Sequence, residues 1–303
     1  MERMIRRRFA KEFRAEAMRI VASAPRHPVQ QRARISYLPM RAWASFAVLA
    51  ILLLTVPTLL PARDSAGTPG KGTVLITGAN RGIGLELARQ YAARGWQVIA
   101  TARKPEEATE LRRLAEAYGG AVVVETLDVT NHLQIDALAR KYRDRPCHLL
   151  INNAGITGGE SSQLLGRMNY EVFRKVLEVN TVAPMKMAEA FLPQLVAAHG
   201  KVVTISSAQG SLSRVDDAQH YWYRASKVAV NMLMHSLAFD VRPNGIAVAL
   251  VAPGPVDTGM NRSRNASLQE PVDAVARIIA VIDRVTLATT GRFWDRNGDD
   301  LPW

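Results

Sequence analysis

The sequence predicts an α/β fold in which helices cover both faces of a doubly wound parallel sheet. From Thr73 onward, short runs of β-branched and aliphatic residues alternate with segments of helical spacing. The strand candidates are apolar at nearly every position, which is typical of parallel strands buried on both faces. Because no internal repeat or low-complexity tract interrupts the alternation, residues 73–303 are expected to form one domain.

The expected elements follow one another along this domain. The first four strands are expected in TVLIT (73–77), WQVIATA (96–102), AVVVETLDV (121–129) and CHLLIN (147–152). Helices are expected after the first three strands, in LELARQYAARG (85–95), PEEATELRRLAEAYGG (105–120) and NHLQIDALARKY (131–142). Two later strands, on either side of long helical segments, are expected in KVVTIS (201–206) and IAVALVAPG (246–254).

The positive charge of the chain is concentrated at its front. Of the net charge of +12, residues 1–41 contribute +8, with eleven Arg or Lys and three Glu. The other 262 residues contribute only +4 and contain no basic stripe interleaved with aromatic residues. We therefore expect no nucleic-acid partner for the globular body.

Residues 42–62 form an uncharged apolar run that reaches the roughly 20 residues needed to span a bilayer. The run predicts a single membrane anchor between a basic segment, 1–41, and a flexible linker, 63–72. The positive-inside rule would then place the body on the far side of the membrane. Two alternatives stay open: a cleaved secretory signal in an exported protein, with Met40 as the start, and a cytoplasmic protein.

Cysteine and histidine usage restricts the chemistry. The single cysteine, Cys147, excludes a disulfide framework within the chain, and it opens an apolar run in which a buried thiol is expected. The six histidines are scattered without metal-ligand spacing. The sequence therefore predicts no metal site.

A glycine-rich turn, TGANRGIG (77–84), joins the first strand to the first helix. Glycine allows the backbone to turn tightly and to approach a diphosphate, whose charge then lies at the helix N-terminus. The turn therefore predicts a dinucleotide site. Its predicted contact residues are Gly78, Asn80, Arg81, Gly82, Ile83 and Gly84.

The end of the second strand indicates which dinucleotide binds. It reads TARKPEE, with Arg103 and Lys104 where an acidic residue usually meets a ribose 2′-hydroxyl. Arg81 in the glycine turn adds a third positive charge. Because cations favour a 2′-phosphate, NADP(H) is predicted, and NAD is the less favoured alternative.

Two further turns follow strands at the same edge of the predicted sheet. Asp128 and Val129, in LDVT, are predicted to contact the cofactor, with Asp128 accepting a hydrogen bond from an adenine amino group. Residues 153–155 of INNAGI, which are Asn153, Ala154 and Gly155, lie where ligands bind in such sheets. Taken alone, all of these residues also suit ordinary turns.

Seven motifs occur in the order TGANRGIG, LDVT, NNAG, LEVNT, VVTISSAQGS, YRASK and VAPGPVDT. This order resembles the short-chain dehydrogenase/reductase family over residues 73–303. IGLELARQ, VIATARKPEEA, NTVAPM, YRASKVAVNML and the ending GRFWDRNGDDLPW resemble its C-factor and sniffer-type carbonyl reductases. The resemblance implies a Rossmann-type sheet, the cofactor NADP(H), and hydride transfer to or from a small carbonyl or alcohol substrate.

The resemblance also implies roles for four residues. Tyr223 would act as general acid or base at the substrate oxygen, and Lys227 would lower its pKa and hold the nicotinamide ribose. Ser207, the second serine of ISSAQG, would hydrogen-bond the substrate oxygen. Asn180 would hold a water that links Lys227 to solvent.

The resemblance implies further cofactor contacts at Tyr223, at Lys227 and in residues 253–258. The backbone of residues 253–258 (PGPVDT), which include Pro253, Gly254, Val256 and Thr258, would line the nicotinamide amide, and Thr258 would contact either the diphosphate or the amide. In this segment the chain departs from the subgroup pattern, because Pro255 and Gly259 stand in place of a tryptophan and an acidic residue. The departure concerns the shape of the substrate pocket rather than hydride chemistry.

An alternative function stays open beside the enzymatic one. A cofactor-binding sensor or signalling protein could keep the same fold without turnover, although such a protein does not need all four of the implied residues. Assembly as a homodimer or homotetramer is a further expectation.

Overall fold

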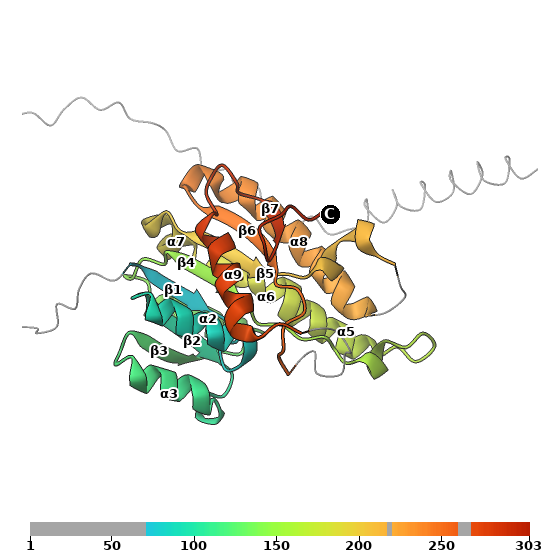
Figure 1. Ribbon diagram of the computed structural model, residues 1–303, viewed down its shortest axis with the longest axis horizontal. Helices are drawn as coiled ribbons and strands as arrows, with labels where there is room; N and C mark the ends of the chain where they lie inside the picture. Colours follow the sequence, from blue (N-terminus) through green and yellow to red (C-terminus); the bar gives the residue numbers. More distant parts are fainter. Residues whose placement is uncertain (1–70, 217–219, 260–267) are drawn as a thin grey trace, which may run out of the picture. The chain divides into compact units, whose positions relative to one another are not determined.

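The computed structural model of the protein describes residues 71–303, with gaps at 217–219 and 260–267. Seven parallel strands form one sheet in the order β3-β2-β1-β4-β5-β6-β7 (Figure 1). The strands are β1 (Thr73–Ile76), β2 (Gln97–Ala102), β3 (Val122–Thr126), β4 (Leu149–Asn152), β5 (Lys201–Ile205), β6 (Ala247–Ala252) and β7 (Arg292–Asp295). The six expected strands are confirmed, and β7 is an additional one.

The helices connect successive strands. They are α2 (Gly82–Ala93), α3 (Thr109–Ala117), α4 (His132–Lys141), α5 (Tyr170–Leu177), α6 (Ala183–Ala190), α7 (Leu192–Ala198), α8 (Tyr221–Val241) and α9 (Pro271–Asp283). Short 3-10 turns are η1 (Pro105–Glu107), η2 (Glu160–Gln163), η4 (Ala208–Gly210), η5 (Leu212–Arg214) and η6 (Arg242–Asn244). A π-helical turn, η3 (Glu178–Val182), joins α5 to α6.

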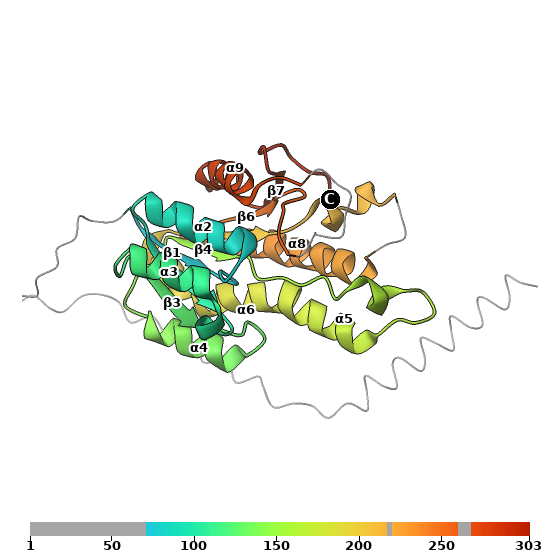
Figure 2. The ribbon, with the colours of Figure 1, turned by 60° about the horizontal axis from the view of Figure 1, so that its bottom comes forward.

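Two hydrophobic cores lie on opposite faces of the sheet. Alternate strand residues point to opposite faces, so Val74 and Ile76 enter one core, whereas Leu75 enters the other. Helices α2, α3 and α9 pack in the first core, and α4, α6, α7 and α8 pack in the second (Figures 1 and 2). Burial on both faces explains why the strand sequences are apolar without alternation.

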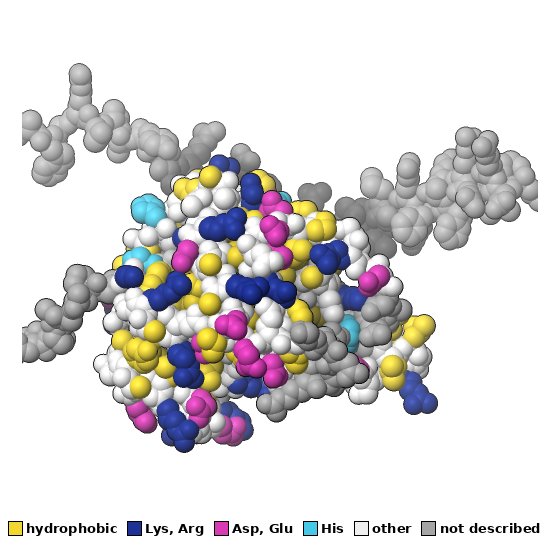
Figure 3. Space-filling view, viewed as in Figure 1, with side chains coloured by type: hydrophobic (Ala, Val, Ile, Leu, Met, Phe, Trp, Pro, Cys, Tyr) yellow, Lys and Arg dark blue, Asp and Glu magenta, His cyan; other side chains and the backbone are white. Residues whose placement is uncertain are grey.

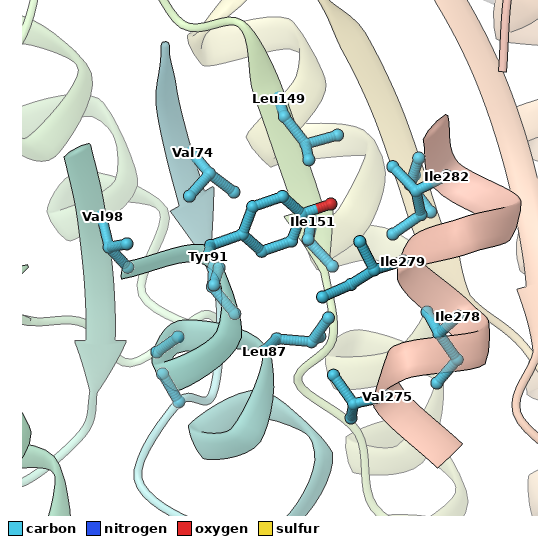
Figure 4. Close-up of a cluster of buried hydrophobic side chains, with 14 of the residues drawn as sticks. Val74, Leu87, Tyr91, Val98, Leu149, Ile151, Val275, Ile278, Ile279 and Ile282 are labelled. Atoms are coloured by element: carbon cyan, nitrogen blue, oxygen red, sulfur yellow. The ribbon is translucent and has the colours of Figure 1, made fainter. Parts of the chain in front are cut away.

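The first core is centred on an aromatic side chain. Tyr91 of α2 is only 1% exposed and lies among aliphatic side chains of the sheet and of α9, including Ile151 and Ile279 (Figure 4). Its ring meets the Trp96 ring edge-on at 5.2 Å between centroids. This packing fixes α2, and therefore the glycine turn that precedes it, against β1.

The parallel arrangement brings all strand carboxyl ends to one edge of the sheet. The chain moves outward from β1 to β2 and β3, and then crosses back to place β4 on the other side of β1. In open α/β sheets, ligands bind outside the carboxyl ends at such a reversal of strand order. The site is therefore expected at this edge, just outside the carboxyl ends of β1 and β4.

Three predicted segments lie outside the described residues: the basic segment 1–41, the apolar run 42–62 and residues 63–70 of the linker. Within the described part of the chain, no helix is long and apolar enough to cross a membrane. On the face drawn in Figure 3, Lys and Arg side chains lie interspersed with Asp and Glu.

Candidate active site

The glycine turn after β1 has the backbone geometry that the sequence predicts. Gly78 and Gly82 adopt left-handed φ angles of +67° and +58°, which glycine accommodates without strain. At Gly84 a Cβ would lie 2.4 Å from the Gly78 carbonyl oxygen, so helix and turn can approach this closely only with glycine. At Gly82 a Cβ would lie 3.0 Å from Cγ2 of Thr258, which places the turn against the loop that follows β6.

The NNAG segment after β4 supports this turn through Thr77, a residue that the sequence analysis does not single out. The Thr77 hydroxyl oxygen accepts from the backbone N–H groups of Asn153 (3.0 Å) and Ala154 (3.1 Å). In return, Asn153 Nδ2 donates to the carbonyl oxygens of Thr77 (2.9 Å) and Gly78 (3.1 Å). The Asn153 side chain therefore braces the glycine turn from the neighbouring strand.

The N-terminus of α2 is suited to an anion. Arg81, at the N-cap, has an extended backbone and makes no capping side-chain hydrogen bond, and the first turn carries no acidic residue. The unpaired N–H groups of a helix start attract negative charge. A cavity of about 480 Å³ adjoins this helix start and is lined by Arg81, Gly82, Thr258 and Gly259, among others.

The predicted adenine-ribose end lies beyond β2 and β3. Arg103 is exposed, and its charge acts on Asp128. Burial would raise the pKa of Asp128, but two hydrogen bonds from Thr130 and the positive charge of Arg103 outweigh burial and lower that pKa. Lys104 instead forms an exposed ion pair with Glu107 at 2.6 Å, so its charge is partly compensated.

Asn180 occupies the π-helical turn η3 and links two segments. Its Oδ1 accepts from the Ile156 N–H at 2.9 Å, and its Nδ2 donates to the Ile156 carbonyl at 2.8 Å and to Ser226 Oγ at 2.9 Å. A Cβ added at Gly155 would lie 3.4 Å from Asn180 Oδ1 and 4.0 Å from Lys227 Nζ. The structure thus brings Gly155, Asn180 and Lys227 together. The predicted water at Asn180 stays a prediction.

Lys227 and Tyr223 lie one turn apart on α8. Lys227 Nζ is 5.5 Å from the centre of the Tyr223 ring and donates to the Ile205 carbonyl at 2.8 Å. Only 5% of Lys227 is exposed, and burial lowers the pKa of its amine to about 8. Tyr221 is 37% exposed, whereas Tyr223 is half-buried.

The two serines after β5 have different surroundings. Ser206 is 2% exposed, and its hydroxyl donates to Asn231 Oδ1 at 2.5 Å. Asn231 Nδ2 in turn donates to the Gly210 carbonyl at 3.1 Å. Ser207 is half-buried, and its Oγ accepts from the Gln209 N–H at 3.2 Å. Ser206 therefore anchors the loop to α8, and Ser207 is the less enclosed hydroxyl.

The comparisons with known proteins agree with this architecture. The sequence profile described as short chain dehydrogenase matches residues 72–269, which is more than half of the chain. The chain belongs to this family.

Two relatives of known designation share about a third of their sequence with the chain. A 1-hydroxy-2-glutathionyl-2-methyl-3-butene dehydrogenase of Rhodococcus sp. (strain AD45) is 32% identical, with 76% of this chain and 99% of the relative covered. C-signal of Myxococcus xanthus is 36% identical, with 52% of this chain and 93% of the relative covered. The predicted resemblance to the short-chain dehydrogenase/reductase family is confirmed.

Solved structures of carbonyl reductases have the same fold. The Sniffer carbonyl reductase of D. melanogaster superposes with a TM-score of 0.72 at 28% identity, covering 77% of this chain and 99% of its own. The NADPH-bound carbonyl reductase from chicken fatty liver superposes with a TM-score of 0.71 at 31% identity, covering 76% of this chain and 98% of its own.

Apart from Asn180, the predicted site residues of this family member lie just beyond a strand or in the first two turns of a helix. Gly78–Gly84 follow β1, Arg103 and Lys104 follow β2, Asp128 and Val129 follow β3, Asn153–Gly155 follow β4, Ser207 follows β5, and Pro253, Gly254, Val256 and Thr258 follow β6. Asn180 lies in η3, and Tyr223 and Lys227 lie in the first two turns of α8.

Sequence reasoning missed the residues that hold these groups in place. Besides Thr77, they include Ser226, Asn231 and Gln163, all of them buried polar side chains. Ser226 and Asn231 lie on the same helix as Lys227, so a search for polar residues on the buried face of YRASKVAVN could have found them. Gln163 is the last residue of the short 3-10 turn η2, where the sequence gives no such signal.

Proposed function

We propose that the chain is an NADP(H)-dependent carbonyl reductase or alcohol dehydrogenase acting on a small-molecule substrate. The observation that carries the proposal is the buried Lys227 amine beside the Tyr223 ring, together with Asn180, at the carboxyl edge of the sheet. A buried amine that lies against a tyrosine at this edge of the sheet is an arrangement suited to proton transfer.

The choice of NADP(H) rests on the fit of the described residues and on the neighbours. The uncapped start of α2 and the glycine turn suit a diphosphate. Arg103 and Arg81 are exposed cations at this edge and suit a 2′-phosphate. The chicken carbonyl reductase binds NADPH, and a Pseudomonas aeruginosa PAO1 carbonyl reductase that is 31% identical was solved with NADP. When bound, this cofactor supplies the hydride.

Tyr223 would give its phenolic proton to the substrate oxygen in reduction and take one in oxidation. An isolated tyrosine has a pKa near 10, so it is a poor base at neutral pH. The nearby Lys227 amine, when protonated, favours the phenolate, and each unit by which the pKa falls corresponds to about 1.4 kcal/mol. Lys227 is held for this purpose by the Ile205 carbonyl, because that hydrogen bond restricts its side chain.

Ser207 would hydrogen-bond the substrate oxygen and stabilise the charge that develops there. Its loop is fixed to α8 through Ser206 and Asn231, so the hydroxyl keeps its place relative to Tyr223. Asn180 would hold the water that returns a proton to Lys227. Its side chain fixes the Gly155–Ile156 backbone beside Lys227, which supports a role next to the amine.

The proposal is tested with the purified protein and a panel of aldehydes and ketones. NADPH oxidation should depend on the carbonyl substrate, and NADPH should bind more tightly than NADH in a fluorescence titration. Replacement of Tyr223 by phenylalanine should remove turnover and retain NADPH binding. Absence of NADPH binding, together with turnover that Tyr223→Phe leaves unchanged, would refute the proposal.

A second candidate is a signalling protein that binds the cofactor without turning it over. The match to C-signal favours this candidate, because that relative is designated by a signal rather than by a reaction. The same experiment separates the two functions. A signalling protein would bind NADPH but reduce none of the carbonyl compounds, and Tyr223→Phe would have no kinetic effect.

We also propose a domain organisation and an assembly. Residues 73–303 would form the catalytic domain, and 42–62 would anchor it to a membrane; residues 1–41 and 63–72 would flank the anchor. Flotation of the full chain and of a 1–72 deletion with membranes tests the anchor. Met232 and Phe239 of α8 are each 65% exposed, which supports a homodimer or homotetramer that sedimentation would detect.

A further inference from the structure

Helix α8, which carries Tyr223 and Lys227, begins at Tyr221 with no hydrogen bond from the side chain of its N-cap residue. The N-cap residue, His220, has a left-handed φ of +57° and makes no capping side-chain hydrogen bond. The first backbone N–H groups of a helix lack intrahelical partners and need acceptors from elsewhere. Trp222, the second residue of the helix, is 5% exposed, so water does not easily supply that acceptor.

The acceptor comes from the 3-10 turn η2, which is far from α8 in the sequence. The Trp222 N–H donates to Oε1 of Gln163 at 2.7 Å, across 59 residues of sequence. Gln163 is itself 4% exposed, and its Nε2 donates to the carbonyl oxygens of Thr157 (3.0 Å) and Gly159 (2.8 Å). Two carbonyl acceptors on one side and one N–H donor on the other fix the orientation of this amide.

The Trp222 side chain strengthens the same connection. Its indole N–H donates to the Ser162 carbonyl at 3.0 Å, and its ring stacks on Phe173 of α5 at 4.4 Å between centroids. A Cβ at Gly158 would lie 2.8 Å from Val176 Cγ2, so the loop passes close to α5. Backbone, side chain and loop therefore converge on the residue that directly precedes Tyr223.

We propose that Gln163 is a positioning residue for catalysis, a remote N-cap that fixes the first turn of α8 and therefore the place of the Tyr223 hydroxyl. The inference rests on the proposed function, since it assigns Tyr223 as the acid or base. Lys227 lies one turn deeper and has its own anchor at Ile205. Loss of the cap should therefore disturb Tyr223 more than Lys227 or the glycine turn.

Replacement of Gln163 by leucine removes the cap at similar volume. We expect kcat to fall by about 10- to 100-fold, because small displacements of a catalytic group have effects of this size. The NADPH dissociation constant should stay within about twofold, since the glycine turn and Arg103 lie on other elements. The pH at which oxidation of an alcohol reaches half its maximum should rise, because a displaced Tyr223 gains less from Lys227.

The matched control is Gln194→Leu. Gln194 is also a buried glutamine, 3% exposed, whose Nε2 donates to a backbone carbonyl, that of Ala139 at 2.8 Å. It lies on α7, so its loss should lower stability without changing kcat or the pH profile. If Gln163→Leu and Gln194→Leu lower kcat equally, Gln163 has only a structural role and the inference is wrong.

Amide hydrogen exchange gives a readout that does not depend on turnover. Peptides covering the start of α8 should exchange faster in Gln163→Leu than in the wild type, and at the wild-type rate in Gln194→Leu. If the wild type reduces no carbonyl compound, the proposed function fails, and this exchange still tests the cap. If Tyr223→Phe abolishes turnover while Gln163→Leu has wild-type kcat and exchange, the cap alone is refuted.

If Gln163→Leu does not fold, Gln163→Met serves in its place. Methionine is an unbranched side chain of similar length, but its thioether is only a weak acceptor, so the Trp222 N–H loses its bond to Oε1 of Gln163. We expect faster exchange at the start of α8 and a reduction in kcat of about 2- to 10-fold, corresponding to one lost hydrogen bond. Wild-type kcat and exchange in this variant would contradict the inference.

Discussion

The side-chain nitrogen of Lys227 lies 5.5 Å from the centre of the Tyr223 ring, one helical turn along the same face of α8. The amine is buried and held by the Ile205 carbonyl, so it cannot swing away to solvent without losing that hydrogen bond. A positive charge in this position lowers the free energy of a tyrosinate relative to a tyrosine. The spacing of YRASK alone, which also suits an ordinary helix start, does not establish this relationship.

The first prediction distinguishes the two tyrosines of YWYRASK. Tyr223→Phe should reduce kcat by at least about 100-fold, because the proton donor is lost and nothing else on α8 replaces it. Tyr221→Phe should retain most activity, since Tyr221 is 37% exposed and lies two positions earlier on a different side of the helix. Steady-state kinetics with one aldehyde checks both variants, and equal losses would show the assignment of Tyr223 to be wrong.

The sequence was sufficient to predict the sheet because both cores depend on aliphatic strand residues such as Val74 and Leu75. It was not sufficient for β7, which has only four residues and begins with an exposed arginine, Arg292. The π-helical turn at Asn180 also escaped prediction, because helical spacing continues through it. Gln163 bonds to Trp222 across 59 residues of sequence, and no local sequence pattern predicts such a contact.

The second prediction concerns the stability of the protein at alkaline pH. The pKa of Lys227 is about 8 in the folded protein, against an ordinary lysine value of 10.5, so between these values the unfolded chain binds more protons. Stability attributable to this group therefore rises with pH across that window, and below pH 8 the cost of burying the charge is fully present. Relative to Lys227→Met, the wild type should gain about 1–2 kcal/mol between pH 7 and 9.5.

Urea unfolding of both proteins at the two pH values measures this difference. Comparison with Lys227→Met removes the contributions of other titrating groups, provided that they are the same in both proteins. If the stability of the wild type relative to Lys227→Met stays constant or falls between pH 7 and 9.5, the pKa of Lys227 is not lowered in the folded state.

The third prediction concerns the choice between NADPH and NADH. Arg103→Ala should weaken NADPH binding by about 10- to 100-fold, the size expected for a lost charge-assisted hydrogen bond, and leave NADH binding nearly unchanged. Lys104→Ala should have a smaller effect, because Lys104 forms an ion pair with Glu107.

Arg113→Ala is the control for the loss of a positive charge. Arg113 is exposed on α3 and pairs with Glu110 at 2.7 Å, so its removal changes net charge without touching the end of β2. Fluorescence titration with both dinucleotides measures all three variants. Equal weakening of NADPH by Arg103→Ala and Arg113→Ala would point to general charge attraction rather than to contact with a 2′-phosphate.

The fourth prediction separates the adjacent serines. Ser207→Ala should lower kcat by about 10- to 1,000-fold with little loss of stability, because its half-buried hydroxyl is proposed to meet the substrate oxygen. Ser206→Ala should do the reverse: it leaves Asn231 Oδ1 without the Ser206 hydroxyl in a buried position, which costs about 1–3 kcal/mol of unfolding free energy. The kcat of Ser206→Ala should fall only to the extent that the lost hydrogen bond displaces the loop that carries Ser207. Kinetics and thermal unfolding of the two variants, measured side by side, test this contrast. If Ser206→Ala loses the activity and Ser207→Ala loses the stability, the two serines have been assigned the wrong way round.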